Sequence, residues 1–336
     1  MALPVLTVVG ATGAQGLSVV SAFSNIKTKY HIRALTSDTS SATATRLAAQ
    51  DDVSVIYADL GSVDSLLAAF KGSSLIFANT AFHPETFLTK GASAAQSREE
   101  QQGLNIVQAA SQTTSLIHFV WSTLPNALSI TKGDYLIPHF QAKIPAENFI
   151  RDPVNGLAGK TTLLRVGLYG SNLAMDPYKP LHVKTADKYL ITFPCSADVA
   201  IPFIGDETVN VGLIVKAILS QPEKTFGRYV LGASEIMSCQ DWAESFAKAL
   251  RRQGHNSDAV FLECSLELFE RIWGHVGTEI GVMFTYFRDI GYTGYEAEAG
   301  GSPILTPKDL GIEASLHSTE DRLATLDWSQ DPPAST

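Results

Sequence analysis

The sequence is poor in cysteine, since its 336 residues contain only three, Cys195, Cys239 and Cys264. They are odd in number, far apart in the sequence and in no CxxC pair, which argues against a disulfide framework and a structural zinc site. The eight histidines show no metal-ligand spacing either. We therefore expect reduced, structural cysteines and no bound metal.

The sequence also has no long hydrophobic run and no excess of basic residues. No window approaches the ~18 apolar residues that a membrane-spanning helix needs, and the apolar stretch Leu3–Val9 leads directly into a glycine loop, as a buried strand does. Asp and Glu number 34 against 25 Lys and Arg, and the net charge is −9. An acidic chain without a dense Lys/Arg run binds phosphate backbones poorly. We expect a soluble, cytoplasmic protein with no nucleic-acid or membrane partner.

The apolar content is sufficient for a sizeable core. Hydrophobic residues make up 45% of the chain and charged residues 18%, a composition that excludes intrinsic disorder. Short apolar runs alternate with helical patterns through the first half, and they predict an α/β fold with a doubly wound parallel sheet of the Rossmann type. The predicted strands are Val5–Val9, His31–Thr36, Val53–Tyr57, Ser74–Asn79, Ile117–Trp121 and Thr162–Val166.

The second half of the sequence lacks this alternation. Residues 167–202 are rich in Gly, Pro, Tyr and Lys and predict an irregular excursion, whereas Tyr229–Leu231 predicts a strand that returns to the sheet. Helices are expected at Ser238–Arg251 and Ser265–Phe287. The chain is therefore expected to form a dinucleotide-binding Rossmann domain over residues 1–166, completed by about 206–232, and a smaller, mostly irregular or helical substrate-binding lobe over 167–205 and 233–336.

Three glycines lie at a GxxGxxG spacing directly after the first predicted strand. Gly10 permits a tight turn, Gly13 lets backbone N–H groups approach a pyrophosphate, and Gly16 lets the following helix pack close to the strand. The helix N-terminus adds unpaired N–H groups and a positive dipole. This context predicts dinucleotide binding, with a plain structural turn, or a Rossmann domain that has lost its ligand, as the alternatives. The residues of the loop are Gly10, Ala11, Thr12, Gly13, Ala14, Gln15 and Gly16.

The end of the second predicted strand is where Rossmann proteins contact the ribose 2′ position. A point ~20 residues beyond the last glycine falls at Thr36, and Ser37 and Asp38 follow it. Asp38 can hold ribose hydroxyls, as an acid does in NAD-binding proteins. Alternatively, the hydroxyl groups can bind a 2′-phosphate with help from Arg33 or Arg46. The residues leave both possibilities open.

Four segments occur in an order that is typical of one protein family. They are the loop GATGAQG, the segment Ile32–Thr36, the step Tyr57-Ala58-Asp59-Leu60 and the segment His139–Lys143. From about Val5 to Ala247 the sequence resembles the NmrA-like family, which belongs to the atypical short-chain dehydrogenases/reductases and is related to isoflavone-reductase-like enzymes. That family includes redox-sensing regulators that bind dinucleotides without turnover, and it is close to fungal secondary-metabolism reductases.

The resemblance implies a nicotinamide dinucleotide site. Many relatives have an arginine that grips the 2′-phosphate where this chain has Ser37, and some have a lysine at Gln101. The resemblance therefore implies NADP, with NAD also possible because both cations are missing. The implied contacts are Ala11 to Gly16 at the pyrophosphate, Thr36 and Ser37 at the 2′ position, Asp59 and Leu60 near the adenine, Asn79, Thr80, Ala81 and Phe82 along the cofactor, Lys143 at the nicotinamide ribose, and Gly167, Leu168, Tyr169 and Gly170 over the nicotinamide.

The candidate catalytic residues are Ser122, His139 and Lys143. Ordinary short-chain dehydrogenases use Ser, Tyr and Lys, with Tyr four residues before Lys, and here that position holds His139. Residues four apart share a helix face, although Pro145 requires the helix to start late, kink or break. Histidine can transfer a proton near neutral pH, Lys143 can act directly, and Ser122 can hydrogen-bond a substrate carbonyl. The alternatives are a solvated lysine and a histidine that caps or packs.

These residues lead to one expected function and two alternatives. The leading expectation is an NAD(P)H-dependent oxidoreductase acting on a carbonyl or conjugated double bond of a small aromatic or polyketide-like metabolite. The absence of tyrosine at position 139 favours a non-catalytic NAD(P)-binding sensor that acts on a protein partner, and a redox-neutral isomerase or cyclase can use the same pocket.

Aromatic residues gather late in the sequence and suggest an apolar pocket for a flat ligand, with ordinary core packing as the alternative. The run Arg98–Glu100 is expected to be a solvated helix face. The aromatic residues are Phe269, Trp273, Phe284, Tyr286, Phe287, Tyr292 and Tyr295, joined by Phe82, Tyr169 and Tyr178.

Overall fold

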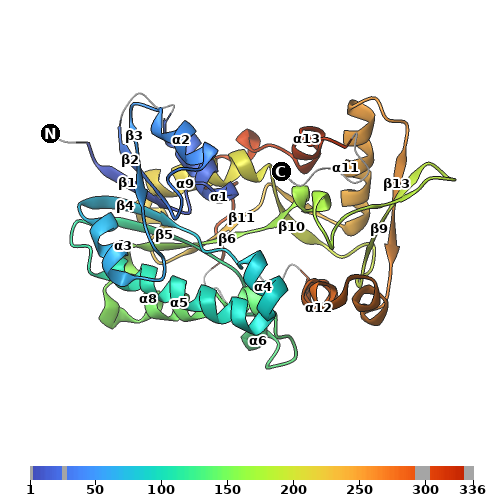
Figure 1. Cartoon of the computed structure of the whole chain (residues 1–336), viewed down its shortest axis with the longest axis horizontal. Coiled ribbons are helices and arrows are strands. Elements are labelled where there is room, and N and C mark those ends of the chain that lie inside the picture. Colours follow the sequence, from blue (N-terminus) through green and yellow to red (C-terminus); the bar gives the residue numbers. More distant parts are fainter. Residues whose placement is uncertain (1–2, 25–28, 292–302, 329–336) are drawn as a thin grey trace.

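The structure is a computed structural model, and it describes residues 3–24, 29–291 and 303–328. Within this part of the chain, a central sheet of seven strands has the order β11-β6-β5-β4-β1-β2-β3, and neighbouring strands are all parallel. The predicted doubly wound Rossmann fold is confirmed (Figure 1). The strands are β1 Val5–Val9, β2 His31–Thr36, β3 Val53–Tyr57, β4 Ser73–Ala78, β5 His118–Thr123, β6 Thr161–Val166 and β11 Tyr229–Gly232.

Helices cover both faces of this sheet, which is why its central strands β5 and β6 are buried along their whole length. Every residue of β5 and β6 is buried, as expected for a parallel sheet between two helical layers. One layer contains α1 Ala14–Ser24, α2 Ala42–Ala48 and α9 Glu207–Ser220. The other contains α3 Val63–Phe70, α5 Ala92–Ser111 and α8 Ile144–Arg151.

The segment that follows the first six strands returns to the sheet, as the sequence predicts. Strand β11 pairs with β6 at the edge, and α9 packs on α1 through a close backbone contact. A Cβ on Gly212 would lie 2.2 Å from the carbonyl oxygen of Ser18, and the Gly212 N–H donates to the Ser18 hydroxyl at 2.9 Å. The predicted division into two domains remains a prediction.

The C-terminal lobe contains more strands than the sequence predicts. Residues 167–202, expected to be irregular, contain β7, β8 and β9. Strands β7 and β8 were missed because they span only two and three residues, and β9 was missed because the turn before it uses Asp187 at φ +46° instead of a glycine signal. In the described residues, two three-stranded sheets have the orders β12-β10-β7 and β13-β9-β8. Their strands are β7 Leu168–Tyr169, β8 Leu181–Val183, β9 Lys188–Phe193, β10 Ile201–Gly205, β12 Glu235–Met237 and β13 Asp258–Glu263.

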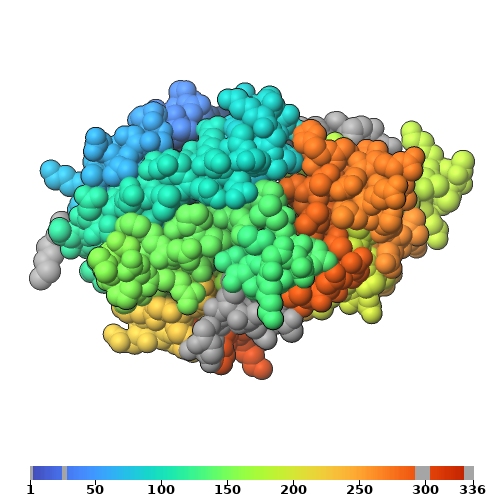
Figure 2. Space-filling model, turned by 90° about the horizontal axis from the view of Figure 1, so that it is seen from below, coloured from blue at the N-terminus to red at the C-terminus, as the bar shows by residue number. Residues whose placement is uncertain are grey.

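The helices of the lobe are α11 Cys239–Arg252, α12 Leu266–Ile290 and α13 Thr319–Ala324, and the first two agree with the predicted helices to within a few residues. Helix α12 is interrupted at Gly274, which has φ 62° and ψ −144°. Beyond this break α12 lies against the first half of the chain, and Figure 2 shows its orange surface directly beside the teal and green surface. The ring of His275 contacts that of Phe87, with centroids 5.4 Å apart, and Tyr135 hydrogen-bonds Asp289.

Among the helices that the structure describes, none combines the length and the apolar character needed to cross a membrane.

Candidate functional site

The site lies at the carboxyl ends of the parallel strands, where the strand order reverses. The chain passes from β1 to β2 and β3 on one side, and then β4 pairs on the other side of β1. Ligands of open α/β sheets bind at such a switch point. Gly10 and Asn79 follow β1 and β4, and a Cβ on Gly10 would lie 3.5 Å from the Asn79 carbonyl oxygen.

The glycine loop has the geometry of an anion cradle. Gly10 adopts φ +68°, and a Cβ on Gly16 would stand 2.2 Å from the Gly10 carbonyl oxygen, so the helix can approach the strand only without a side chain there. The first helical hydrogen bond runs from the Leu17 N–H to the Gly13 carbonyl at 2.8 Å. The Gly13 N–H donates to the Gly10 carbonyl at 3.0 Å, whereas the N–H groups of Ala14, Gln15 and Gly16 have no partner among the described residues and can bind an anion.

The residues after β2 form a local hydrogen-bonded turn. The hydroxyl groups of Thr12 and Thr36 lie 3.3 Å apart, which ties the glycine loop to the end of β2. The Asp38 carboxylate accepts from the N–H and the hydroxyl of Ser40 at 2.8 and 2.6 Å, and these bonds lower the pKa of Asp38. Ser37 is exposed.

The two arginines considered as partners of a 2′-phosphate, Arg33 and Arg46, lie in different parts of the fold. The Arg33 guanidinium donates to the carbonyls of Ala69 and Lys71 at 2.6 and 2.8 Å, just before β4 begins. The Arg33 guanidinium is therefore directed to the opposite end of the sheet from Ser37, which argues against the alternative in which Arg33 helps to bind a 2′-phosphate. Arg46 is exposed in the last turn of α2.

The predicted adenine-side residues follow β3. The Asp59 carboxylate accepts from the Gly61 N–H at 2.8 Å, and the side-chain amide of Asn105 donates to the Leu60 carbonyl at 2.8 Å. These bonds fix the turn at the carboxyl end of β3, beside the end of β2.

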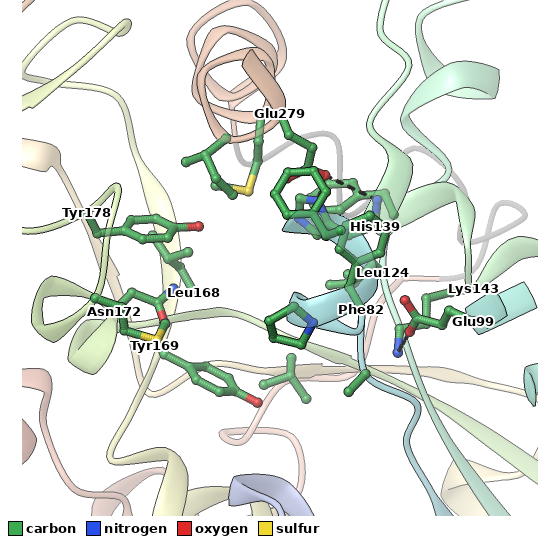
Figure 3. A pocket seen from close by; sticks show the side chains of 18 of the residues that line it. Phe82, Glu99, Leu124, His139, Lys143, Leu168, Tyr169, Asn172, Tyr178 and Glu279 are labelled. Atoms are coloured by element: carbon green, nitrogen blue, oxygen red, sulfur yellow. Dashed lines mark hydrogen bonds and ion pairs between the residues drawn. The ribbon is translucent and has the colours of Figure 1, made fainter. Parts of the chain in front are cut away.

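A cavity of about 510 Å³ opens next to these strand ends and is walled by both halves of the chain (Figure 3). Its size suits a small organic ligand. The predicted residues that line it are Gln15, Asn79, Thr80, Ala81, Phe82, Ser122, His139, Lys143, Gly167, Leu168 and Tyr169. The predicted residues outside its lining are Gly10, Ala11, Thr12, Gly13, Ala14, Gly16, Thr36, Ser37, Asp59, Leu60 and Gly170.

The expected aromatic wall is only partly formed by the late aromatic residues. Phe287 lines the cavity, together with the expected Phe82, Tyr169 and Tyr178. Phe269, Phe284 and Tyr286 are fully buried in the core, and Trp273 packs beside Phe269. Tyr292 and Tyr295 lie outside the described residues. The sequence missed several other lining residues, among them Glu99, Asn172, Met175, Val276, Glu279, Ile280 and Met283.

Lys143 lies in a buried polar cluster with Glu99 and Thr80. Its ammonium is 2.7 Å from Glu99 Oε1 and donates to the carbonyl and hydroxyl oxygens of Thr80 at 2.6 and 2.8 Å. The Asn79 side-chain oxygen is 3.3 Å away. Lys143 is 6% exposed and Glu99 1%, so neither is a solvated residue.

The expectation that Arg98–Glu100 is a solvated face is therefore wrong for Glu99. Its position could have been found from spacing, because Ala95, Glu99 and Gly103 are four residues apart and all face the interior. Gly103 marks the inner face, since a Cβ there would contact Ala146 and Trp121 at 3.2 and 3.5 Å.

His139 is held by a different carboxylate. Its Nδ1 contacts Glu279 Oε1, and its backbone N–H donates to the same oxygen at 3.3 Å. The helix break predicted from Pro145 is confirmed, because α7 Pro138–Gln141 ends before α8 begins, with Lys143 as the N-cap of α8. His139 and Lys143 thus face one cavity from two separate helices.

The remaining predicted residues join the sheet to the lobe. Ser122 is 3% exposed in β5. Gln15 donates to the Tyr169 hydroxyl at 2.8 Å, and burial raises the pKa of Tyr169. A Cβ on Gly167 would lie 2.5 Å from the Pro202 carbonyl oxygen, and one on Gly170 2.2 Å from Thr319. Packing within the lobe therefore explains these two glycines.

The arrangement fits a dinucleotide, because an anion cradle opens beside a cavity with a buried lysine. Gln15 Oε1 is buried and has no hydrogen-bond partner among the described residues. The same part of the chain has no cluster of three His, Cys, Asp or Glu residues suited to a metal ion.

A family model described as the NmrA-like family matches residues 4–330. The chain belongs to the NmrA-like family. The NmrA-like family domain-containing oxidoreductase hkm9 of Aspergillus hancockii is 29% identical over 250 residues, which cover 72% of this chain and 71% of that protein. A similarly named oxidoreductase of Malbranchea aurantiaca, malD, is 26% identical over 248 residues, 72% of this chain and 71% of that protein.

Solved structures share the NmrA-like fold. NmrA, a negative transcriptional regulator, in complex with NAD has a TM-score of 0.72 at 19% identity, covering 98% of this chain and 100% of that chain. The NADPH-dependent quinone oxidoreductase QOR2 from Escherichia coli, complexed with NADPH, has a TM-score of 0.65 at 17% identity, covering 95% of this chain and 97% of that one. At these identities the likeness is one of fold.

Proposed function

We propose that this NmrA-like protein is an NAD(P)H-dependent oxidoreductase acting on a carbonyl or conjugated double bond of a small aromatic or polyketide-like molecule. One observation carries the proposal: a single cavity is lined by Gln15 of the glycine loop, by buried Lys143 and by an apolar wall. The names of the relatives hkm9 and malD, both oxidoreductases, support it.

The proposed cofactor contacts follow the order of the strand ends. The free amides of the first turn of α1 hold the pyrophosphate, Thr36 and Ser37 face the 2′ position, and Asp59 and Leu60 lie near the adenine. The residues from Asn79 to Phe82 and from Gly167 to Gly170 flank the nicotinamide half, with Lys143 at its ribose. When bound, the cofactor supplies a hydride.

We assign NADP as the preferred cofactor and NAD as a possible one. Hydroxyl groups at the end of β2 can accommodate a 2′-phosphate, but no cation lies beside Ser37 among the contacts of the described residues. The test is a pair of dissociation constants, for NADP and NAD, measured at one salt concentration. Equal values would overturn the preference.

The substrate is proposed to be small and mainly apolar. Besides the aromatic rings, the cavity wall includes the apolar side chains Leu124, Leu168, Val276, Ile280 and Met283. Such a wall favours ligands with a large apolar surface because that surface leaves water on binding.

The activity is tested with NADPH and a panel of benzil, trans-chalcone and 2-methyl-1,4-naphthoquinone, by following the absorbance of the reduced nicotinamide. We expect oxidation of NADPH with at least one compound, and its loss in Lys143→Ala. If Lys143→Ala binds NADPH and keeps the full rate, the role of Lys143 is wrong.

A second candidate is a non-catalytic sensor that binds NAD(P) and acts on a protein partner. It is supported by the fold likeness to NmrA, a negative transcriptional regulator, and by the absence of tyrosine at position 139. Tight cofactor binding without oxidation of NADPH across the panel would favour the sensor over the enzyme.

A further inference from the structure

We propose that Glu279 is a positioning residue that holds His139, and that His139 delivers the proton to the substrate oxygen. The proposal rests on the proposed oxidoreductase function. Its basis is that the C-terminal lobe places a buried carboxylate directly on the imidazole of His139, the histidine that lines the cavity among the described residues (Figure 3).

The contacts of Glu279 are concentrated on one residue. The side chain is 6% exposed on α12, and a buried carboxylate is costly unless it is hydrogen-bonded. Its Oε1 contacts both Nδ1 and the backbone N–H of His139. These two bonds fix the position and the rotation of the ring together.

This contact also sets which ring nitrogen faces the ligand. A carboxylate accepts hydrogen bonds, so Nδ1 carries a proton and donates it in a hydrogen bond to Glu279. Nε2 has no hydrogen-bond partner within the described part of the chain, and His139 lines the cavity. Nε2 is therefore the ring atom that can give a proton to a ligand, or take one from it.

Lys143 is less suited to this step. Its ammonium has three protons, and it already contacts Glu99, both oxygens of Thr80 and Asn79. Loss of a proton would leave the Glu99 carboxylate buried without its cation, which is costly. Lys143 is thus a fixed cation beside the cofactor site, and the proton falls to His139.

Tyr178 completes the polar end of the cavity. Its hydroxyl points into the cavity (Figure 3), and burial, together with the nearby Glu279 charge, raises the pKa of Tyr178. The hydroxyl therefore stays protonated and can donate a hydrogen bond to a substrate oxygen.

The step balances for the reduction of a ketone. The hydride brings two electrons to the carbonyl carbon, and the π pair of the C=O bond moves to oxygen. The imidazole of His139 enters the step with a proton on each nitrogen. The substrate oxygen takes the proton of Nε2, whose N–H bond breaks with its electron pair left on nitrogen, and an O–H bond forms. His139 is left neutral, with Nδ1–H still donating to Glu279.

Glu279 also links the Glu279–His139 pair to a second cavity. It lines a second cavity of about 490 Å³ between α12 and residues 87–92 and 136–138, together with His275 and the exposed Leu136. Among the described residues, Glu279 and Phe87 are shared by the linings of both cavities. This second cavity, beside the exposed Leu136, is the route by which we expect the proton of His139 to be replaced from solvent.

The first test is structural and needs no cofactor. Nitrogen-15 NMR of the histidines in the cofactor-free native protein should show a proton on Nδ1 of His139, either alone or together with one on Nε2, with the signals assigned by their absence in His139→Gln. Glu279→Gln keeps a hydrogen-bond acceptor and should keep this proton on Nδ1, whereas Glu279→Leu should lose it. A ring protonated at Nε2 alone in the native protein would overturn the proposal.

The second test is kinetic, with NADPH and benzil, or the compound of the panel that the native enzyme reduces fastest. We expect Glu279→Leu to lower kcat about 100-fold with KM for the substrate nearly unchanged, and Glu279→Gln to recover part of the loss. Because both variants retain the glycine loop, NADPH should bind them as it binds the native enzyme, which also reports that they fold.

The outcomes separate the two proposals. If the native enzyme reduces the probe and Glu279→Leu does so equally fast, the positioning role is wrong and the oxidoreductase stands. If Glu279→Leu does not fold, His139→Ala must show the same loss of kcat, and full activity of that variant would overturn the proposal. If the native enzyme reduces no compound, the proposed function fails and the proton step fails with it.

Discussion

Two buried carboxylates, Glu99 and Glu279, each hold one basic side chain at the cavity. Glu99 pairs with Lys143 at 2.7 Å, and Glu279 contacts His139. Both carboxylates and Lys143 are buried, so the loss of a basic partner leaves a carboxylate unpaired, and the loss of Glu99 leaves the Lys143 ammonium unpaired. Single substitutions at this site therefore affect the stability of the protein as well as its chemistry.

We expect Glu99→Gln to lower the free energy of unfolding by about 3 kcal/mol, because the Lys143 ammonium would remain buried without a counter-charge. Glu100→Gln is the matched control, since it makes the same chemical change at the neighbouring, partly exposed position, and should change stability by about 0.5 kcal/mol or less. Urea unfolding measures both. Equal effects in the two variants would show that the buried pair does not stabilise the fold.

His118 gives a prediction for pH. Burial lowers its pKa to about 4, from an ordinary value of about 6.5, while its Nε2 lies 2.8 Å from the Thr162 hydroxyl. Between these values the unfolded chain binds a proton that the folded protein does not, so stability falls as the pH falls.

From about pH 7 to about pH 4, we expect the native protein to lose on the order of 3 kcal/mol more stability than His118→Gln, which does not titrate. Urea unfolding at a series of pH values measures the difference. A difference that stays constant across this range would contradict the prediction.

Ser37 provides a test of cofactor preference. Its exposed position at the end of β2 is where the resemblance implies an arginine in relatives. A charge-assisted hydrogen bond contributes about 1.5–3 kcal/mol, so Ser37→Arg should tighten NADP binding about tenfold or more and leave NAD binding nearly unchanged. Fluorescence titration with both cofactors measures the two affinities. An equal increase in affinity for NADP and NAD would show that position 37 does not contact the 2′-phosphate.

At the scale of elements, the glycine loop allows folding and binding to be separated. A Cβ on Gly16 would stand 2.2 Å from a backbone oxygen, whereas one on Gly13 would lie at an ordinary 3.5 Å. We expect Gly16→Ala to lower the free energy of unfolding by about 2 kcal/mol or more, because α1 must move away from β1.

Gly13→Ala should fold with nearly native stability but bind NADP about tenfold more weakly, because its methyl group would obstruct the approach of the pyrophosphate. Urea unfolding and a fluorescence titration of NADP measure the two effects on both variants. Unchanged NADP affinity in Gly13→Ala would show that the pyrophosphate does not bind at this loop.

The sequence predicts those elements whose signal is local. The glycine loop and the apolar strands follow from short patterns, because a parallel sheet buried on both faces needs continuous apolar runs. Glu279 could not be predicted as a partner of His139, because only the packing of α12 on the first half brings together residues 140 positions apart. The short strand β7 escaped for the same reason, since it is defined by its pairing with β10.

At the scale of the whole molecule, one hydrophobic core extends through both halves of the chain. Trp121 of β5 and Trp242 of α11 are fully buried members of the same cluster. Residues that share a core lose their packing together, so the two halves should unfold in one transition.

We expect Trp121→Phe, which keeps Trp242, Trp273 and Trp328 in the second half, and the triple variant Trp242→Phe/Trp273→Phe/Trp328→Phe, which keeps Trp121 in the first half, to show a single transition each. Within each variant, circular dichroism and fluorescence should give the same urea midpoint. Separate midpoints in either variant would show that the C-terminal lobe unfolds independently.

The break at Gly274 has a consequence for how this protein can diversify. The stretch from His275 to Ile290 is a separate helical segment. It is joined to the preceding helical turns through Gly274, whose φ is positive. It carries Val276, Glu279, Ile280, Met283 and Phe287 of the cavity wall. Substitutions in this stretch, in evolution or by design, can therefore change which ligands fit the cavity without altering the glycine loop.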